Sequence, residues 1–340
     1  MIYSVQYLRG IAALMVVLHH IEIKGGQYGN GALNGYHIGY FGVDLFFIIS
    51  GFIMCHTTSN KDISFRKFMG ARIFRILPLY WLITTVALAV FLIAPGMVNS
   101  GGGTTSIWAS YFLAPNGARY LVDNGWTLRY EFFFYLIFGA SLLIKTNQRG
   151  LLITAIISTL TLAGFVMKPD NPWGEFFLDK LLLEFVMGIF AFHVLKRSPP
   201  SPALALLLLI GGIVALVVQN IYGNYETPLH RVISGGVPML CIFIGLVRFE
   251  EMFRQSNNLF FKAFERLGDS SFSLYLAHPF VLSPAAIILY KINLGNYTTL
   301  FTLLLLSSAI ITGWLCYKFV ELPLTRFIKQ KNFSRENKIA

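Results

Sequence analysis

Charged residues are scarce in this chain: they make up 13% of its 340 residues, against about a quarter in soluble globular proteins. Hydrophobic residues make up 55%. This balance excludes a disordered chain, because disordered chains are rich in charge and poor in apolar residues. The apolar residues form blocks long enough to cross a bilayer, which takes roughly 20 residues each. The composition therefore predicts a multi-pass membrane protein.

Cysteine is scarce as well. Cys55, Cys241 and Cys316 stand singly within apolar stretches, without the spacing of metal ligands, so they are interpreted as small, inert hydrophobic residues and no metal site is predicted. A cleavable signal peptide is not expected either, because the first apolar block contains Arg9 and lacks a small-residue cleavage site.

The formal charge of +11 does not indicate a nucleic-acid-binding protein. No basic stripe interleaved with stacking aromatic residues occurs in a polar segment of the sequence. The excess of Lys and Arg is instead expected to attract membrane lipids with anionic headgroups and anionic ligands in the cytosol.

Apolar runs bounded by Gly, Pro and charged residues predict about ten transmembrane helices, since helices satisfy their own backbone hydrogen bonds in lipid. The runs lie at 5–21, 39–57, 76–94, 127–145, 151–167, 180–195, 202–219, 232–249, 271–290 and 298–319. With a cytoplasmic amino terminus, most Lys and Arg of the loops fall on the inner side, as expected for multi-pass proteins. The fold class predicted is an all-α polytopic bundle in the cytoplasmic (inner) membrane, with both termini cytoplasmic.

Two regions are distinguished. Residues 1–326 form the predicted membrane domain, and residues 327–340 form a short polar cytoplasmic tail. The longest outer loop, about residues 95–126, is expected to make a flexible or re-entrant cover over the outer face.

Arg9 and His20 are the first candidate functional pair, because ionisable residues inside a membrane usually mark function. They are eleven residues apart, about three helical turns, so they project from one helix face roughly 16 Å apart along its axis. The alternative is that Arg9 extends to the lipid headgroups and the histidine makes a hydrogen bond between helices.

Asp44 and Glu131 are candidate acids near the outer ends of the second and fourth spans. Both are expected at the level of His20, where three helices would then supply one base and two acids. Alternatively, each carboxylate lies solvated at the membrane interface without a role in chemistry.

Arg72 and Arg75 precede the third apolar run on its inner side. Residues at i and i+3 share a helix face, and guanidinium groups suit phosphates. The alternative is ordinary anchoring by the cationic residues that flank membrane helices.

Trp126, Tyr275 and His278 are candidate substrate contacts. The Trp126 ring is suited either to stacking on a sugar or to anchoring at the interface. His278 precedes Pro279, where a helix bends or releases a backbone carbonyl, so a role in a ligand cavity and a role at the kink both stay open.

Six sequence blocks follow one another along the chain and resemble the integral-membrane acyltransferase 3 family, most closely its exopolysaccharide O-acetyltransferases of the ExoZ type. The blocks are the Arg9-to-His20 spacing, Gly-Val-Asp-Leu-Phe-Phe-Ile-Ile-Ser-Gly-Phe from residue 42, Arg-x-x-Arg from residue 72, Trp-Thr-Leu-x-x-Glu from residue 126, Ser-Leu-Tyr-Leu-Ala-His from residue 273 and Glu-x-Pro from residue 321.

The resemblance implies transfer of an acyl group, usually acetyl from acetyl-CoA, to a sugar hydroxyl of an exported or surface polysaccharide or a lipid-linked glycan. It also implies that Arg9 and His20 are the functional pair of the first helix, that Arg72 and Arg75 are associated with the acetyl-CoA donor, and that Glu131 is the matching acid. Acetyl-CoA is then a substrate, and no permanently bound cofactor is expected.

In the mechanism expected from these residues, His20 acts as general base on the hydroxyl or becomes transiently acetylated. Glu131 or Asp44 would orient its ring, as the third member of a triad does. The alternative functions are a transporter of a glycan or small anion, and a structural subunit of an export complex. A transporter is disfavoured because paired, Gly/Pro-interrupted segments in two halves do not occur in the sequence. A homo-oligomer is compatible with the sequence.

Overall fold

The computed structural model describes residues 2–28, 31, 33–59, 61–98, 102–144, 146–199, 201–223, 231–256 and 258–336. Within these ranges the chain is helical and contains no β-strand, apart from one isolated bridge between Thr105 and Arg119. The prediction of an all-α fold is confirmed.

Each predicted apolar run lies on a helix. The helices are α1 (Tyr3–Gln27), α2 (Gly42–Thr58), α3 (Phe65–Ile93), α4 (Pro95–Val98), α5 (Ile107–Phe112), α6 (Gly125–Ala140), α7 (Thr146–Met167), α8 (Pro172–Phe177), α9 (Leu183–Arg197), α10 (Pro202–Tyr222), α12 (Val237–Val247), α13 (Glu250–Gln255), α14 (Leu259–Asp269), α15 (Ser271–Lys291), α16 (Thr298–Cys316) and α17 (Leu322–Glu336).

Seven helical segments of the described residues are long and apolar enough to cross a membrane. They are Tyr3–Gln27, Ile38–Thr58, Phe65–Ile93, Gln148–Met167, Pro202–Tyr222, Ser271–Lys291 and Thr298–Ile328. A multi-pass membrane protein is thus confirmed. The three other predicted runs correspond to the shorter helices α6, α9 and Val232–Val247, so the total of ten spans stays a prediction.

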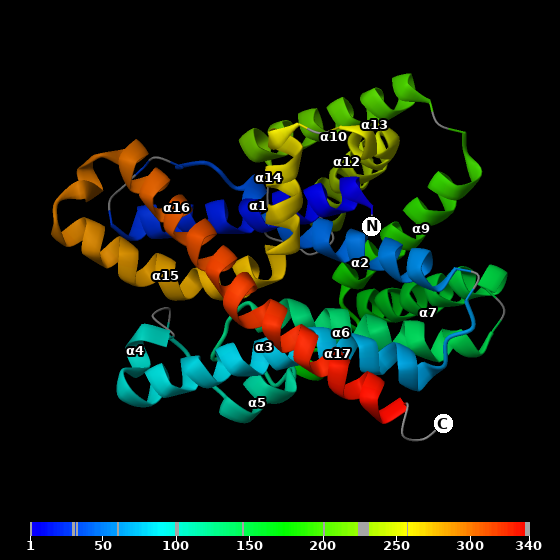
Figure 1. Ribbon diagram of the computed structural model, residues 1–340, viewed down its shortest axis with the longest axis horizontal. Helices are drawn as coiled ribbons and strands as arrows, with labels where there is room; N and C mark the ends of the chain where they lie inside the picture. Colours follow the sequence, from blue (N-terminus) through cyan, green and yellow to red (C-terminus); the bar gives the residue numbers. More distant parts are fainter. Residues whose placement is uncertain are drawn as a thin grey trace.

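Helical structure extends furthest beyond the predicted runs at the start of α3 and after the end of α16. The start of α3 lies at Phe65, where the Ser64 side chain caps the helix by accepting a hydrogen bond from the Lys67 backbone. At the other end of the chain, α16 continues through a π-helical turn (Tyr317–Glu321) into α17. The residues predicted as a polar tail therefore begin inside α17, and these two helices form one diagonal rod in Figure 1.

The predicted outer loop contains ordered structure that packs along α3. Within it, α5 lies beside α3, where the Tyr80 hydroxyl donates to the Ser110 carbonyl (2.6 Å) and the Trp81 indole donates to the Tyr111 carbonyl (2.9 Å). The segment that follows α5 leads into α6, whose Gly125 lies against the Tyr80 ring. The first turn of α6 is therefore held beside the middle of α3.

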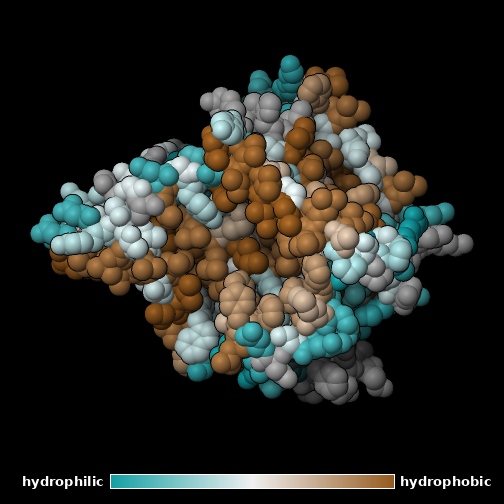
Figure 2. Space-filling view, turned by 90° about the horizontal axis from the view of Figure 1, so that it is seen from above, coloured by the Kyte–Doolittle hydropathy of each residue, from teal (hydrophilic) through white to brown (hydrophobic). Residues whose placement is uncertain are grey.

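The core is built around α2, which packs against α1, α6, α9 and α12. In Figure 1, α1 and α2 run through the middle of the molecule, with α10, α12 and α13 above them and α3, α6 and α7 below. Apolar side chains also cover much of the outside, in a broad band with hydrophilic surface toward its two ends (Figure 2). The exposed residues of α10 are apolar, and so are most of those of α7, as expected for helices that face lipid.

A glycine pair allows α2 and α9 to pack closely. A Cβ atom added to Gly51 would lie 2.1 Å from the Phe185 carbonyl oxygen, and one added to Gly188 would lie 2.1 Å from the Ile48 carbonyl oxygen. Small residues of this kind let helix backbones approach each other within a membrane. This contact fixes the depth of α2, which carries Asp44 and Ser50.

We expect Gly188→Ala to destabilise the protein by about 1–3 kcal/mol, the usual range for overpacking a tight contact. The matched control is Gly211→Ala on α10, where an added Cβ atom has no neighbour within 4 Å and alanine favours the helix. Thermal unfolding in detergent should give a lower midpoint for Gly188→Ala than for Gly211→Ala. Equal midpoints for the two variants would show that the α2–α9 contact is looser than described.

Candidate active site

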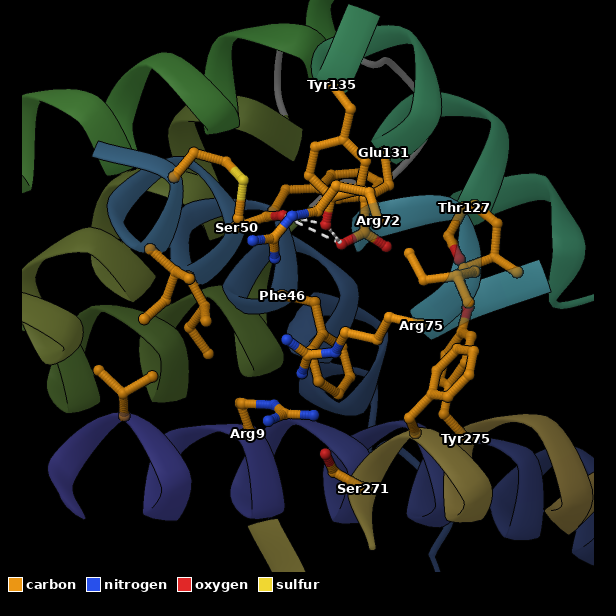
Figure 3. Close-up of a pocket in the computed structure, with 18 of the residues that line it drawn as sticks. Arg9, Phe46, Ser50, Arg72, Arg75, Thr127, Glu131, Tyr135, Ser271 and Tyr275 are labelled. Carbon is orange, nitrogen blue, oxygen red and sulfur yellow. Dashed lines mark hydrogen bonds between the residues drawn. The ribbon is translucent and has the colours of Figure 1, made fainter. Parts of the chain in front are cut away.

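A cavity of about 400 Å³ lies between α1, α2, α3, α6 and α15. We call it the arginine cavity, because Arg9, Arg72 and Arg75 line it. Figure 3 shows Arg9 reaching into the cavity from α1, and Arg72 and Glu131 from the opposite side, with Arg75 between them. The cavity therefore unites residues from the first, third and fourth predicted spans.

Arg9 is oriented by a chain of hydrogen bonds. Its Nη1 donates to Gln6 Oε1 (3.0 Å), and Gln6 Nε2 donates to Asp269 Oδ1 (2.6 Å). Asp269 comes within reach because Gly268 lies against the Gln6 backbone, closer than any side chain would allow. The pKa of Asp269 is raised from its ordinary value, chiefly by burial, although Arg9 and the hydrogen bond from Gln6 act in the opposite direction.

Glu131 is the acid of this cavity. Its Oε1 accepts hydrogen bonds from the Ser50 hydroxyl (3.0 Å) and from the Tyr135 hydroxyl. The guanidinium of Arg72 lies over the Tyr135 ring, 6.0 Å from its centroid, and its Nε is buried without a hydrogen-bond partner among the described residues.

The charges that line the cavity are three arginines against one glutamate. Among the described residues, no ion pair within 4.0 Å involves any of these four side chains. Positive charge in a partly enclosed site with low-dielectric walls attracts anions strongly. The arrangement is therefore suited to a ligand with more than one negative charge, such as a group of phosphates.

His20 and His278 form a second centre beside the cavity. Their rings lie 4.9 Å apart between centroids, and His278 Nε2 lies 3.4 Å from His20 Nδ1. His20 Nδ1 also contacts the Val16 carbonyl and His278 Nδ1 the Leu274 carbonyl, both at 2.9 Å. Because a carbonyl oxygen only accepts, each Nδ1 carries a proton. In the neutral ring, Nε2 of His20 is then the basic nitrogen.

Tyr275 connects the two centres. It lines the arginine cavity, its hydroxyl lies 2.9 Å from that of Thr127, and its ring centroid lies 6.3 Å from that of His278. Pro279 has no N–H to donate to the Tyr275 carbonyl four residues earlier, and Asn124 Nδ2 donates to that carbonyl instead (2.6 Å). The helix α15 thus continues through Pro279, and Asn124 supplies a hydrogen bond to the released carbonyl.

Asp44 lies in a third, separate cluster. Its carboxylate makes a two-pronged ion pair with Arg231, with a shortest contact of 2.6 Å, and both side chains are buried. The Arg231 guanidinium also lies over the Tyr40 ring, 3.8 Å from its centroid. Glu184 is a second, fully buried acid that interacts with both members of the pair.

The expectation that Asp44 and Glu131 flank His20 is wrong in its geometry. Among the described residues, His20 makes its hydrogen bonds to Val16 and His278, whereas Glu131 lies among the arginines. The reason is the register of α2 against α1: Gly39 contacts Met15 and His19, and Gly42 contacts Ala12 and Val16. Because α2 runs back toward the start of α1, Asp44 lies nearer the amino-terminal end of α1 than His20 does.

The three candidate substrate contacts, Trp126, Tyr275 and His278, do not lie in one site. Tyr275 lines the arginine cavity and His278 contacts His20, but Trp126 lines a different pocket of the described structure. The ring of Trp126 lies 5.8 Å from the Arg231 guanidinium.

Arg231 and Glu184 are site-adjacent residues that the sequence analysis did not select. Glu184 lies inside the apolar run 180–195, so the same rule that selected Asp44 could have found it. Arg231 directly precedes the run 232–249 and thus lies outside the predicted spans. Its pairing with Asp44, 187 positions away, is visible only in the folded structure.

Comparison with known proteins gives one family match. A family model described as an acyltransferase domain, that of the acyltransferase 3 family, matches residues 2–318. No solved structure is significantly similar to the chain.

Several curated proteins are similar. The exopolysaccharide production protein ExoZ of Rhizobium meliloti is 31% identical, over 86% of this chain and 92% of that protein. The acyltransferase MdmB of Streptomyces mycarofaciens is 26% identical, over 96% of this chain and 92% of that protein. YrhL of Bacillus subtilis, for which peptidoglycan O-acetyltransferase activity has been proposed, is 25% identical, over 96% of this chain and 55% of that protein.

We expect Arg231→Met to destabilise the protein by about 3–5 kcal/mol, because removing one partner leaves the buried carboxyl groups of Asp44 and Glu184 without their cation. The matched control is Glu251→Gln, which breaks the exposed ion pair between Glu251 and Arg254 and should change stability by at most about 1 kcal/mol. Thermal unfolding in detergent at neutral pH measures both. A midpoint of Arg231→Met equal to that of the control would contradict the structural role of the buried cluster.

Proposed function

This chain belongs to the acyltransferase 3 family of membrane enzymes, and we propose that it transfers an acetyl group from acetyl-CoA to a hydroxyl of an exported or surface polysaccharide. Similarity to ExoZ, an exopolysaccharide production protein, supports a polysaccharide acceptor. The observation that carries the proposal is the convergence of Arg9, Arg72 and Arg75 on one cavity next to a pair of histidines.

The arginine cavity is the proposed donor site. Acetyl-CoA carries several phosphate charges at one end, and these match the excess of two positive charges among the cavity residues (three arginines, one glutamate). Guanidinium groups bind phosphate oxygens through paired hydrogen bonds. The uncharged arm that bears the thioester would then extend past Phe46, Thr127 and Tyr275, which line the cavity, toward the histidines.

His20 is the proposed general base. Its Nε2 accepts the proton of the acceptor hydroxyl while the hydroxyl oxygen attacks the thioester carbonyl. The C–S bond then breaks, and the proton passes from His20 to the departing thiolate, so that an ester and free CoA are formed. The reaction needs neither metal nor ATP. An alternative route passes the acetyl group through the His20 ring before the hydroxyl attacks.

His278 and the Val16 carbonyl take the place expected for a carboxylate. Both lie on the Nδ1–H side of His20, where they hold the ring in the tautomer that leaves Nε2 basic. They also accept hydrogen bonds from the imidazolium that forms when Nε2 gains its proton. In this proposal His278 is a positioning residue for His20.

Glu131 has a proposed role among the arginines. Its carboxylate, held by Ser50 and Tyr135, keeps the guanidinium groups from repelling one another while the donor is absent. It leaves enough positive charge to bind phosphates.

The proposed placement in the membrane has ten helices and both termini in the cytoplasm. The distribution of Lys and Arg supports it. Arg72 and Arg75 then lie toward the cytosol, where acetyl-CoA is made, and His20 lies nearer the outer side of the cytoplasmic membrane. The reaction would thus join a cytosolic donor to an acceptor on the other side.

We expect Arg72→Gln to weaken acetyl-CoA binding by about tenfold or more, because hydrogen bonds to charged groups contribute about 1.5–3 kcal/mol. Binding of radiolabelled acetyl-CoA to the purified protein measures this. The control is Arg66→Gln, an exposed arginine near the start of the same helix that does not line the cavity, and it should bind like the original protein. Unchanged binding by Arg72→Gln would remove the arginine cavity as the donor site.

We expect His20→Ala to lower acyl transfer at least about 100-fold, the usual contribution of a general base, while acetyl-CoA binding stays unchanged. Ester-linked acetyl groups on the surface polysaccharide, measured in cells that carry the variant as their sole copy, report the transfer. Normal acetylation with a normal amount of the variant in the membrane would exclude His20 as the base.

A further inference from the structure

A second pocket, of about 320 Å³, lies on the other side of the first turn of α6 from the arginine cavity. We call it the Trp126 pocket. It is bounded by residues 117–123, by α6, and by α8 with the segment that follows it. Its volume falls within the range of small-molecule sites.

Helix α6 lines both cavities, but it contributes different residues to each. Thr127 and Leu128 face the arginine cavity, whereas Trp126 and Arg129 face the Trp126 pocket. The arginine cavity has the charge of an anion site. The Trp126 pocket is lined by three acids and two arginines, so its formal charge is −1, and it is unsuited to a phosphate ligand.

The polar groups of the Trp126 pocket are arranged for a ligand with both hydrogen-bond donors and acceptors. Asp179 is held in place, since it accepts hydrogen bonds from the Tyr130 hydroxyl (2.6 Å) and the Leu181 backbone (2.9 Å). The Arg129 guanidinium lies over the rings of Tyr130 and Phe176, about 5 Å from each centroid, and its buried Nε has no hydrogen-bond partner among the described residues.

Opposite charges face this pocket without neutralising each other. Its acids and arginines form no ion pair within 4.0 Å in the described part of the chain. Sugar hydroxyls both donate to carboxylates and accept from guanidinium groups, and aromatic rings beside a few polar groups are typical of ligand sites. The Trp126 ring is half-buried at the pocket and supplies such an apolar face.

The pocket also lies next to the reacting centre. Asp123 lines it and interacts electrostatically with His20 and with Tyr275. The next residue, Asn124, donates its hydrogen bond to the Tyr275 carbonyl. A ligand in the Trp126 pocket would therefore approach the histidines from one side of α6, and a donor in the arginine cavity from the other.

We propose that the Trp126 pocket binds the acceptor as an uncharged sugar residue, with Asp123 and Glu175 accepting hydrogen bonds from its hydroxyls and Arg129 donating to them. This inference rests on the proposed acetyl transfer. It adds where the acceptor binds and that the bound sugar residue is uncharged. An acidic sugar is disfavoured because its carboxylate would face three acids.

The test uses the purified full-length protein, radiolabelled acetyl-CoA, and unacetylated polysaccharide isolated from cells that lack the protein. Glu175→Gln and Asp123→Asn should each raise the KM for polysaccharide about tenfold, the loss expected for a hydrogen bond to a charged group. The KM for acetyl-CoA should stay the same. Both side chains are exposed, so the substitutions should leave folding intact. The control is Asp170→Asn, an exposed acid outside the pocket.

The outcomes separate the two proposals. If the original protein transfers no acetyl group to the polysaccharide, the proposed function fails. If it does, but Glu175→Gln and Asp123→Asn match Asp170→Asn in their KM for polysaccharide, the Trp126 pocket is not the acceptor site. The double variant Asp123→Asn/Glu175→Gln changes the formal charge of the lining from −1 to +1. A lower KM for polysaccharide in this variant would show that the acceptor is acidic and would overturn the proposal of an uncharged sugar.

Discussion

Keeping arginine side chains charged inside an apolar helix bundle is the constraint on which the other features of this structure depend. Burial of a charge costs several kcal/mol unless partners or water compensate it. The protein compensates its buried arginine charges in two ways. Arg231 is neutralised by Asp44 in a buried ion pair. Arg9, Arg72 and Arg75 instead surround a cavity with a single glutamate, which leaves positive charge available for an anionic ligand.

The first two turns of α6 lie between the arginine cavity and the Trp126 pocket. They place Glu131 and Thr127 on the arginine cavity and Trp126 and Arg129 on the second pocket, while Asn124, just before them, fixes α15 through the carbonyl released by Pro279. In the proposed mechanism, the donor and the acceptor approach the pair of histidines from different sides of this helix.

The sequence predicted the class of the protein and several residues of the arginine cavity, the proposed donor site. Low charge and long apolar runs predicted a multi-pass helical protein, and the i, i+3 spacing predicted that Arg72 and Arg75 share a face. Both side chains line one cavity with Arg9. The sequence analysis misplaced Asp44 because it counted depth from the ends of apolar runs, and α2 begins beside the middle of α1 rather than at its end.

Local chemistry along the chain determined which residues are helical, which of them are too polar to face lipid, and which pairs on a single helix lie on one face. Only the tertiary structure decided which polar residues meet. Asp44 pairs with Arg231 and His20 with His278, at separations of 187 and 258 residues. Such contacts depend on helix register and on close glycine contacts such as that between α2 and α9. Periodicity within one helix carries no information about its offset against a distant one.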